Sequence, residues 1–530
     1  MLVTRMRIRL RPPARPIYPP SSLPGSRRMS SRDYQDAIKH LNSLQSNFAT
    51  LEAVRASGGR ISESAIPEMV EYLERIGYKK EDLNRLNVIH VTGTKGKGST
   101  CAFTDSILRH AKPDWKVGLY TSPHLVAVRE RIRINGAPIS EEDFAKFFFE
   151  VWDRLDANDK RKSPTTSAKP MYFRYVTLVA FHAFLTLNVD ATILEVGVGG
   201  AYDSTNIVPK PIVTGVSALG IDHTAVLGNT IRDIAWQKGG IYKEGVPALT
   251  VSQPEEGMAM LKQQSIDRQA SEFIIVPVTP ELSEIKLGLA GTHQVQNAKL
   301  AVQLAHKFLQ IQGSVAPEMA LPDSFIKGLE QARWPGRCQT VPDPKYPATT
   351  WYLDGAHTVE SLDCCVQWFV SPQVALRPLE SESRPLRVLV FNCTHGRSGT
   401  SFLGTVLAKA SAQLKLHDSL VSSDTLFDAV IFCANVTYAD GRFKGDLTAV
   451  SIPEDDLAQL KTQTELAAAW SSLIPSFPKE SIHVHPSIEH AVRIVRKLEG
   501  DGRPVDVLVT GSLHLVGGVI EVAGLADVAL

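Results

Sequence analysis

Hydrophobic positions change their spacing along the chain, and this change predicts where helices and strands lie. From Asp33 onward, apolar side chains recur every three or four residues over 34–44 and 66–76, which is typical of amphipathic helices. Segments of helical length at 100–110 and 172–187 then alternate with short β-branched runs, at residues 88–92, 116–121, 191–196 and 212–216. Strands alternating with helices predict an α/β fold, with a parallel sheet covered by helices on both faces.

The second half repeats this alternation with strands of its own, at residues 349–353, 387–392, 429–433, 482–485 and 505–510. A Pro-Gly pair at 335–336 ends a helix-like segment and precedes a new strand. We therefore expect an N-terminal domain at 33–334 and a smaller, Rossmann-like α/β domain at 335–530. Charged or Ser/Pro-rich interruptions, expected to be loops or insertions, are at 153–170, 371–385 and 437–478.

Composition narrows the class of protein. The chain has 530 residues, of which 43% are hydrophobic and 21% charged, so it is too long for one small module and too apolar for a disordered chain. Its net charge of +1 gives no global attraction to nucleic acid. No apolar stretch long enough for a bilayer lacks ionisable groups, so we expect no integral membrane segment. The six cysteines form no C-x-x-C pair, which fits a reducing compartment and argues against zinc.

The first 32 residues differ from the rest of the chain. They carry eight arginines and six prolines and no acidic residue, a bias typical of an organelle import segment. A disordered basic tail is the alternative. Translation from Met29 would remove nearly the whole segment. We therefore expect the protein in the mitochondrial matrix and in the cytoplasm, the balance depending on use of Met1 or Met29.

The strongest motif is Gly-Thr-Lys-Gly-Lys-Gly-Ser-Thr at residues 93–100, between a predicted strand and a predicted helix. Closely spaced glycines let successive backbone N–H groups face a phosphate chain, and the start of a helix favours negative charge. Lys97 can reach the β- and γ-phosphates, and Ser99 or Thr100 can supply a hydroxyl near Mg²⁺. The usual spacing asks for Gly where Val91 stands. A structural turn is the alternative, but this context favours nucleotide binding.

Candidate metal ligands follow three other strands. Glu195 closes the apolar strand at 191–196, where a buried acid needs a partner, although a solvated strand-end acid is the alternative. Near the strand at 212–216, metal chemistry alone favours Asp222 over His223, because Mg²⁺ prefers oxygen. Ser122, after the strand at 116–121, is a metal ligand or a helix cap.

These motifs, in this order, resemble the folylpolyglutamate synthases of the Mur ligase superfamily. The resemblance rests on 93–100 and on further segments, at residues 121–125, 129–136, 194–206, 220–224, 236–241, 334–337 and 353–357. Gly200-Ala201 and the Trp-Gln-Lys-Gly-Gly-Ile run at 236–241 are more similar to the eukaryotic branch than to the bacterial bifunctional enzymes.

The resemblance implies roles for individual residues. It implies a P-loop ATPase domain and a glutamate-ligase domain, with ATP, Mg²⁺ and possible use of a monovalent cation such as K⁺. It implies that His223, and not Asp222, is a metal ligand. Lys238 matches a lysine that is carbamylated in related ligases. The ATP contacts that it implies are Gly96, Lys97, Gly98, Ser99, Asn297, Arg337 and Asp354. The Mg²⁺ ligands are Ser122, Glu195 and His223; the catalytic group is Lys97, Lys238 and His357; the glutamate contacts are His357 and Ser512. Thr358 stands where many relatives have Asn.

The chemistry that the resemblance implies is ATP-dependent addition of glutamate to the γ-carboxyl of tetrahydrofolate and its polyglutamates, through an acyl phosphate. The alternative is a dihydrofolate synthase, which adds the first glutamate to dihydropteroate with the same phosphate machinery. A regulatory GTPase would need an Asn-Lys-x-Asp base-reading motif, which is absent from the sequence. We expect small-molecule substrates and a monomer, with no nucleic-acid partner.

Overall fold

The computed structural model describes most of the chain, in nine ranges: 32–45, 64–162, 166–277, 280–313, 321–378, 384–393, 399–447, 460–500 and 503–530. Except for Arg32, the basic segment and its import prediction lie outside the described residues. No helix in the described ranges is long and apolar enough to cross a membrane.

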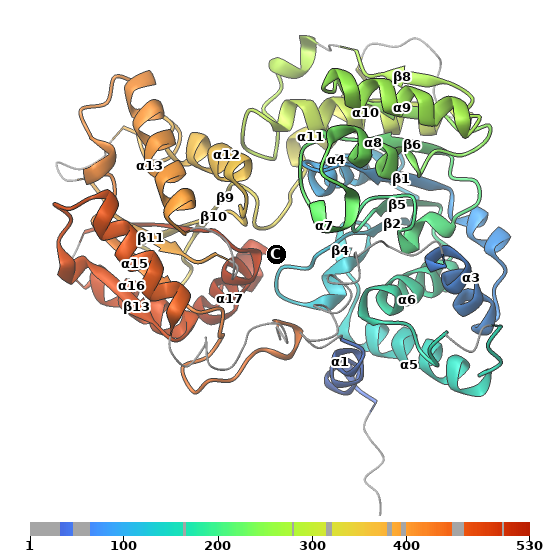
Figure 1. The fold of residues 1–530 in the computed structure, drawn as a ribbon, viewed down its shortest axis with the longest axis horizontal. Coiled ribbons are helices and arrows are strands. Elements are labelled where there is room, and N and C mark those ends of the chain that lie inside the picture. The colour runs from blue at the N-terminus through green and yellow to red at the C-terminus, as the bar shows by residue number, and fades with distance from the viewer. Residues whose placement is uncertain are drawn as a thin grey trace, which may run out of the picture.

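An eight-stranded sheet forms the centre of the N-terminal half (Figure 1), in the order β4-β3-β2-β5-β1-β6-β7-β8. Its strands are β1 (Val88–Thr92), β2 (Val117–Tyr120), β3 (Ile132–Ile134), β4 (Ala137–Pro138), β5 (Ala191–Glu195), β6 (Val213–Val216), β7 (Ala248–Thr250) and β8 (Phe273–Ile275). Along the sheet from β2 through β5, β1, β6 and β7 to β8, neighbouring strands run parallel, as predicted. At the other edge, β3 runs antiparallel to β2 and to β4, an addition to the sheet that the alternation of strands and helices did not indicate. Asn135 and Gly136 both have positive φ there, which suits a two-residue hairpin turn.

Helices cover both faces of this sheet because its strands are apolar on both sides. Along β1 and β5, Val88 and Leu194 point into one core cluster while Ile89 and Ile193 point into another. The first cluster is covered by α1 (Tyr34–Ser43), α3 (Ala65–Arg75), α5 (Glu141–Ala157) and α6 (Tyr172–Leu187). The second is covered by α4 (Lys97–Ala111), α10 (Gln294–Ile311) and α11 (Asp323–Gln331). Three helices lie elsewhere along the sheet: α7 (Thr224–Leu227), α8 (Ile231–Gly239) and α9 (Glu255–Asp267).

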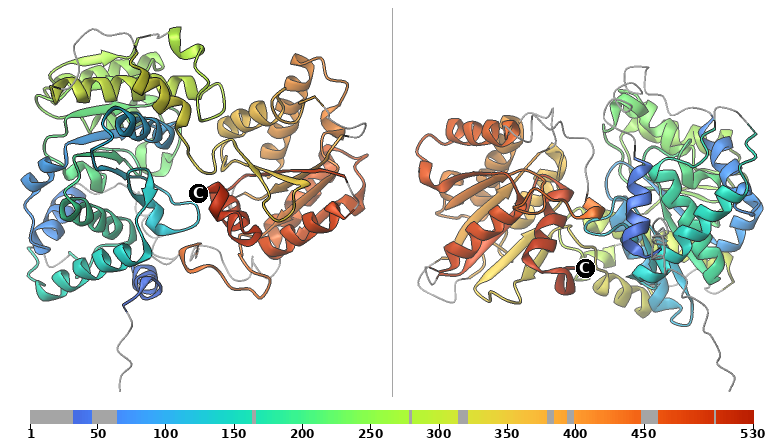
Figure 2. Two further views of the ribbon diagram at one scale, coloured as in Figure 1. Left: turned by 180° about the vertical axis from the view of Figure 1, so that it is seen from behind. Right: turned by 90° about the horizontal axis from the view of Figure 1, so that it is seen from below.

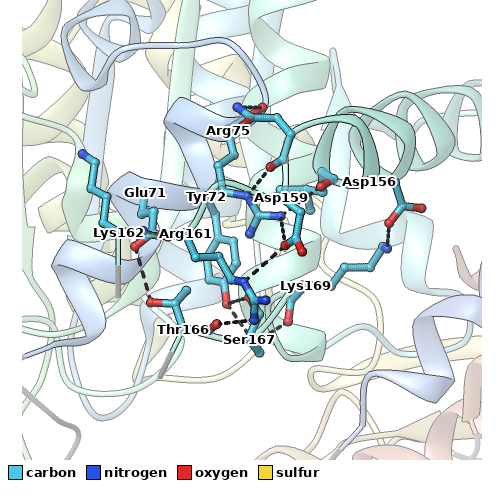
Figure 3. Close-up of polar contacts among 12 residues, drawn as sticks. Glu71, Tyr72, Arg75, Asp156, Asp159, Arg161, Lys162, Thr166, Ser167 and Lys169 are labelled. Atoms are coloured by element: carbon cyan, nitrogen blue, oxygen red, sulfur yellow. Dashed lines mark hydrogen bonds and ion pairs between the residues drawn. The ribbon is translucent and has the colours of Figure 1, made fainter. Parts of the chain in front are cut away.

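Two buried charged side chains of α3 form hydrogen bonds with the segment that joins α5 to α6 (Figure 3). Arg75 donates from Nε to the carbonyl of Asn158 at 2.7 Å, and Glu71 accepts from the backbone N–H of Lys162 at 2.9 Å. Both side chains are buried, so these hydrogen bonds take the place of the hydrogen bonds that the charged groups would otherwise make with water. The segment is thus held against α3, and α6 begins where Phe173 reaches the interdomain cleft.

A six-stranded sheet forms the C-terminal half (Figure 2), in the order β13-β12-β11-β14-β10-β9. Its strands are β9 (Gln339–Pro342), β10 (Thr349–Leu353), β11 (Leu386–Phe391), β12 (Ala429–Cys433), β13 (Ile482–His485) and β14 (Val505–Thr510). All pairs are parallel except β9 with β10. Its main helices are α12 (Val359–Phe369), α13 (Gly399–Leu416), α15 (Lys461–Leu473), α16 (Ile488–Glu499) and α17 (Leu513–Ala523), followed by the short α18 (Ala526–Ala529).

Two segments that the sequence predicts as loops or insertions contain helix instead. Helix α5 continues to Ala157, inside the predicted interruption at 153–170, and α15 lies inside the one at 437–478. Both segments are rich in charged and polar residues, but each also carries apolar residues that are buried against the core, such as Leu155 and Trp470. Burial of such residues sustains a helix whose surface is polar. The predicted domain boundary at 334 and 335 lies in the connection between α11 and β9.

Candidate active site

The candidate residues gather because they follow neighbouring parallel strands. Strands β2, β5, β1 and β6 are adjacent, and their carboxyl ends lead into Ser122, Glu195, the loop at 93–96 and the loop at 217–223. The carboxyl ends of β10 and β14 in the second sheet lead into Asp354 and Ser512. Both groups line one cleft of about 650 Å³ between the two sheets.

The lining of this cleft contains most of the predicted site residues. Those present are Gly96, Lys97, Gly98, Ser99, Ser122, Glu195, His223, Asn297, Arg337, Asp354, His357 and Ser512. Lys238 does not line the cleft but lies behind the phosphate loop, within hydrogen-bonding distance of the carbonyl of Gly93. The structure therefore brings the whole predicted set to one place.

The phosphate loop is shaped by close packing against its neighbours. Gly93 has positive φ, and a Cβ at this position would lie 1.9 Å from the hydroxyl of Ser217. Gly96, also with positive φ, precedes the first residue of α4, Lys97, and a Cβ there would lie 2.0 Å from Oδ1 of Asn297. Helix α4 has no side-chain cap at this end, so its first N–H groups and its dipole are directed toward the cleft.

Two lysine ammonium groups meet at one backbone carbonyl. Lys97 Nζ donates to the carbonyl oxygen of Gly93 at 3.1 Å, and Lys238 Nζ donates to the same atom at 2.7 Å. Burial lowers the pKa of Lys238 well below its usual value, and the nearby positive charge of Lys97 lowers it further. The neutral amine of Lys238 is thus favoured more than in an exposed lysine.

Ser122 and Glu195 offer oxygen ligands beside the phosphate loop. The backbone N–H of Ser122 donates to Oε2 of Glu195 at 3.1 Å, so the serine lies directly against the carboxylate. Burial raises the pKa of Glu195, while the charge of Lys97 opposes this effect. A buried carboxylate beside a serine is the oxygen-rich donor set that Mg²⁺ accepts together with phosphate oxygens and waters. His223 lines the same cleft, and its pKa is lowered by burial, which keeps the ring neutral and able to bind a metal.

No three His, Cys, Asp or Glu side chains of the described ranges converge as a metal cluster. A metal here would therefore depend on the serine and on substrate oxygens as well as on Glu195. Asp222, favoured by metal chemistry alone, instead forms an ion pair with Lys95, whose Nζ lies 3.2 Å from Oδ2. Burial raises the pKa of Asp222, but Lys95 and His223, through their charge and hydrogen bonds, together outweigh this effect, so the pKa lies below its usual value.

The C-terminal residues of the cleft are held by their own domain. Asp354 accepts from the backbone N–H of Cys338 at 2.8 Å and from that of Ala356 at 2.9 Å, which fixes the loop after β10. The ring Nδ1 of His357 donates to the carbonyl of Gly355 at 3.0 Å, which orients the ring within the same loop.

Several cleft residues were not assigned a role from the sequence. They are Lys95, His124, Arg131, Arg133, Phe173 and Trp334. Trp334 lies against the phosphate loop, where a Cβ on Gly98 would be 3.0 Å from its Nε1, and the guanidinium of Arg133 lies 5.4 Å from the centre of its ring. Lys95, His124, Arg131, Arg133 and Trp334 do fall within the family-like segments, so position in those segments was the available signal. Phe173 carries no such signal.

Comparisons with known proteins agree with this arrangement. No family model matches the chain. A folylpolyglutamate synthase of Saccharomyces cerevisiae is 44% identical over 513 residues, covering 94% of this chain and 89% of the relative. Among solved structures, Mycobacterium tuberculosis folylpolyglutamate synthase complexed with ADP has a TM-score of 0.65 at 22% identity, covering 93% of this chain and 99% of that chain. E. coli FolC in complex with DHPP and ADP has a TM-score of 0.61 at 22% identity, covering 93% and 98%.

Proposed function

The chain belongs to the folylpolyglutamate synthase family, and from this premise we propose how its own residues share the work of the reaction. The protein is an ATP-dependent ligase that adds glutamate to folates. We assign the active site to one interdomain cleft because it is lined by the phosphate loop, by Glu195 and by the C-terminal loop at Asp354.

ATP occupies the end of the cleft at the phosphate loop. The start of α4 and the ammonium of Lys97 receive the phosphates, because both supply positive charge toward the same space. Asn297 and Trp334 flank the loop and face the rest of the nucleotide, while Arg337 and Asp354 reach it from the second domain. The nucleotide thus contacts both domains.

The folate and the incoming glutamate occupy the cleft beyond Glu195. Arg131 and Phe173 line this part, so a cation for a carboxylate and an aromatic surface for a flat ring system are both present. His357 and Ser512 face it from the C-terminal domain and are the residues that we assign to the free glutamate.

Ser122, Glu195 and His223 would hold Mg²⁺. When bound, Mg²⁺ supplies positive charge that offsets the charge of the phosphate oxygens. The carboxylate of Glu195 and the ring of His223 are ready for this role, because the serine N–H orients the first and burial keeps the second neutral. A monovalent cation such as K⁺ is a further part of this proposal.

The reaction runs in two steps. A γ-carboxylate oxygen of the folate attacks the γ-phosphorus of ATP, the bond to the bridging oxygen breaks, and ADP leaves. The amine of glutamate then attacks the acyl carbon of the resulting acyl phosphate, phosphate leaves and the amine loses a proton to solvent or a nearby base. Lys97 stabilises charge on the phosphoryl group that is transferred, and closure of the domains excludes the water that would hydrolyse the acyl phosphate.

Lys238 suits a carbamate, the modification of the matching lysine in related ligases. Only the neutral amine attacks CO₂, and burial favours that form. The nitrogen forms a bond to the carbon of CO₂ and loses a proton to solvent, so the product carries a negative charge that would pair with the ammonium of Lys97. Intact-protein mass measured in bicarbonate, for the protein and for Lys238→Met, tests this assignment: only the former should gain the mass of CO₂.

The choice of acceptor separates this function from its nearest alternative. Purified protein with ATP, Mg²⁺ and glutamate is offered tetrahydrofolate or dihydropteroate, and ADP release and product mass are measured. We expect successive glutamyl additions to tetrahydrofolate. Extension of dihydropteroate alone would show a dihydrofolate synthase instead.

We also propose that the protein acts as a monomer in the cytoplasm and in the mitochondrial matrix. The monomer is supported by a cleft lined by both domains of one chain, and light scattering after gel filtration tests it. The two locations are supported only by the basic composition of residues 1–32. Fluorescent fusions that begin at Met1 or at Met29 should separate into mitochondrial and cytoplasmic pools.

A further inference from the structure

Residues 437–447 of the C-terminal domain extend toward the N-terminal helix α1, where Figures 1 and 2 show an orange loop beside the blue helix. We call residues 437–447 the strap. Its base is fixed to α17 of its own domain: the hydroxyl of Tyr438 donates to Glu521 at 3.0 Å, and Lys444 Nζ lies 2.6 Å from the other oxygen of the same carboxylate. The strap is therefore anchored in one domain and directed into the other.

At the tip of the strap, Asp446 accepts hydrogen bonds from three groups of the N-terminal domain. The hydroxyl of Tyr34 on α1 lies 2.6 Å from Oδ1, and the backbone N–H of Val128 lies 2.8 Å from the same oxygen. The backbone carbonyl of Asp446 accepts from Nε2 of His124 at 2.8 Å. Asp446 is only 8% exposed, so little water could take its place as the hydrogen-bond acceptor for these donors.

His124 connects this contact to the cleft. Its Nδ1 accepts from Nε of Arg131 at 3.0 Å, so the ring is neutral and its proton lies on Nε2, facing Asp446. His124 and Arg131 both line the cleft, and Ser122 lies two residues before His124 in the same loop. A chain of hydrogen bonds thus runs from the strap to the part of the cleft assigned to the folate.

The loop also packs into the C-terminal domain. Leu125 and Val126 belong to the hydrophobic cluster that includes β14 and α17. The contact with α17 is tight, because a Cβ on Gly517 would lie 1.8 Å from the carbonyl oxygen of Leu125. Residues 122–131 are therefore held from one side by the sheet that carries Ser122 and from the other by the C-terminal domain.

We propose that Asp446 is a positioning residue for the ligase reaction, holding residues 122–131 so that Ser122 and Arg131 face the cleft when the two domains are closed. The proposal rests on the proposed function, since it assigns Asp446 to the acceptor side of that cleft. Without the carboxylate, the buried N–H of Val128 and the hydroxyl of Tyr34 lose their partner, and the loop regains the freedom to leave the cleft.

The test compares Asp446→Ala, Asp446→Asn and Tyr34→Phe with a matched control, Asp506→Ala. Asp506 is also buried, more deeply than Asp446, and lies in the same domain, but it pairs with Arg377, at 2.8 and 2.9 Å, and does not line the cleft. Each full-length variant is assayed for KM and kcat with ATP and with tetrahydrofolate, and its unfolding temperature is measured.

We expect Asp446→Ala to lower kcat/KM for tetrahydrofolate about tenfold or more, with KM for ATP changed less than about twofold. Asp446→Asn keeps an oxygen acceptor and should recover most of the loss. Tyr34→Phe should lower kcat/KM for tetrahydrofolate in the otherwise unmodified protein. It should have no further effect when it is combined with Asp446→Ala. Asp506→Ala should lower the unfolding temperature without this selective loss of kcat/KM for tetrahydrofolate.

A purely structural role would give Asp446→Ala the pattern of Asp506→Ala, with a lower unfolding temperature and unchanged KM values, and would overturn the proposal. If Asp446→Ala does not fold, Tyr34→Phe decides alone, since it removes one hydroxyl: an unchanged kcat/KM for tetrahydrofolate overturns the proposal. Failure of the unmodified protein to add glutamate would instead contradict the proposed function.

Discussion

The ammonium of Lys95 in the phosphate loop lies 3.1 Å from the hydroxyl of Thr358, at the start of α12 in the other domain. The same ammonium lies 3.2 Å from Asp222, so one side chain joins the nucleotide loop, the loop after β6 and the C-terminal domain. Thr358 also caps α12, because its hydroxyl accepts from the N–H of Ser361. A polar bridge therefore crosses the cleft beside the phosphates.

This bridge predicts coupling between Lys95 and Thr358. Either Lys95→Met or Thr358→Val should lower kcat about tenfold, the value of one charged hydrogen bond, because each removes the same contact. The double variant should be little worse than Lys95→Met alone, as ADP release at saturating ATP and glutamate would show. Thr358→Ser, which keeps the hydroxyl, is the control. Strictly additive losses would mean that the two residues act separately.

Lys97 should be indispensable for phosphoryl transfer. In Lys97→Ala, ADP release should fall at least about a hundredfold, since the charge that meets the transferred phosphoryl group is gone. Lys39→Ala, which changes an exposed lysine on α1, should keep full activity. The far-ultraviolet circular dichroism of both variants should match that of the unmodified protein. Substantial ADP release by a folded Lys97→Ala protein would contradict the assigned role.

Glu195 should set the requirement for Mg²⁺. Glu195→Gln keeps the shape of the side chain but removes its charge, so the Mg²⁺ concentration for half-maximal ADP release should rise about tenfold or more. Glu142→Gln, on the exposed first turn of α5, is the matched control and should leave this concentration unchanged. The same Mg²⁺ dependence in both variants would remove Glu195 from the metal site.

His90 should make stability fall in mild acid. Its Nε2 donates to the hydroxyl of Thr205 at 2.8 Å, because that hydroxyl donates to Asp203, and its buried Nδ1 has no hydrogen-bond partner among the described residues, as suits a neutral ring. Burial lowers the pKa of His90 to about 3, against a usual value of 6.5. Below pH 6.5 the unfolded chain binds a proton that the folded protein does not, so the free energy of unfolding declines as pH falls toward 3.

The size of this effect can be measured between pH 7 and pH 5. The unmodified protein should lose about 2 kcal/mol more than His90→Asn, at roughly 1.4 kcal/mol per pH unit below the unfolded pKa. Urea unfolding at the two pH values gives both differences. Equal losses in the two proteins would show that His90 is protonated in the folded state or contributes nothing to the pH dependence.

The parts of the fold that could be predicted from the sequence are those whose signal is local. The strand at β1 and its glycine-rich loop combine a β-branched run with turn residues over about a dozen positions, so both were predicted. Strands β7 and β8 have three residues each, too few for a recognisable alternation, and were missed. The edge hairpin is shorter still, since β3 has three residues and β4 has two.

The missed parts of the site depend on contacts between distant segments. Asp446 follows one glycine in a polar stretch and carries no motif, yet its carboxylate meets Val128 across 318 residues of sequence. Lys95 was visible in the phosphate motif, but its partner Thr358 is 263 residues away. No spacing rule links such pairs, because the packing of the two domains decides which residues meet.

The central claim is that the cleft joins folate and glutamate through an acyl phosphate. The most direct test uses tetrahydrofolate labelled with oxygen-18 in its γ-carboxyl group, with ATP, Mg²⁺ and glutamate, and measures the mass of the phosphate that is released. Attack of the carboxylate on the γ-phosphorus predicts that the phosphate released with the first glutamyl unit carries one labelled oxygen. Phosphate released with later units is unlabelled, because those additions use the γ-carboxyl of the glutamate just added. Unlabelled phosphate accompanying the first glutamate addition would contradict this mechanism.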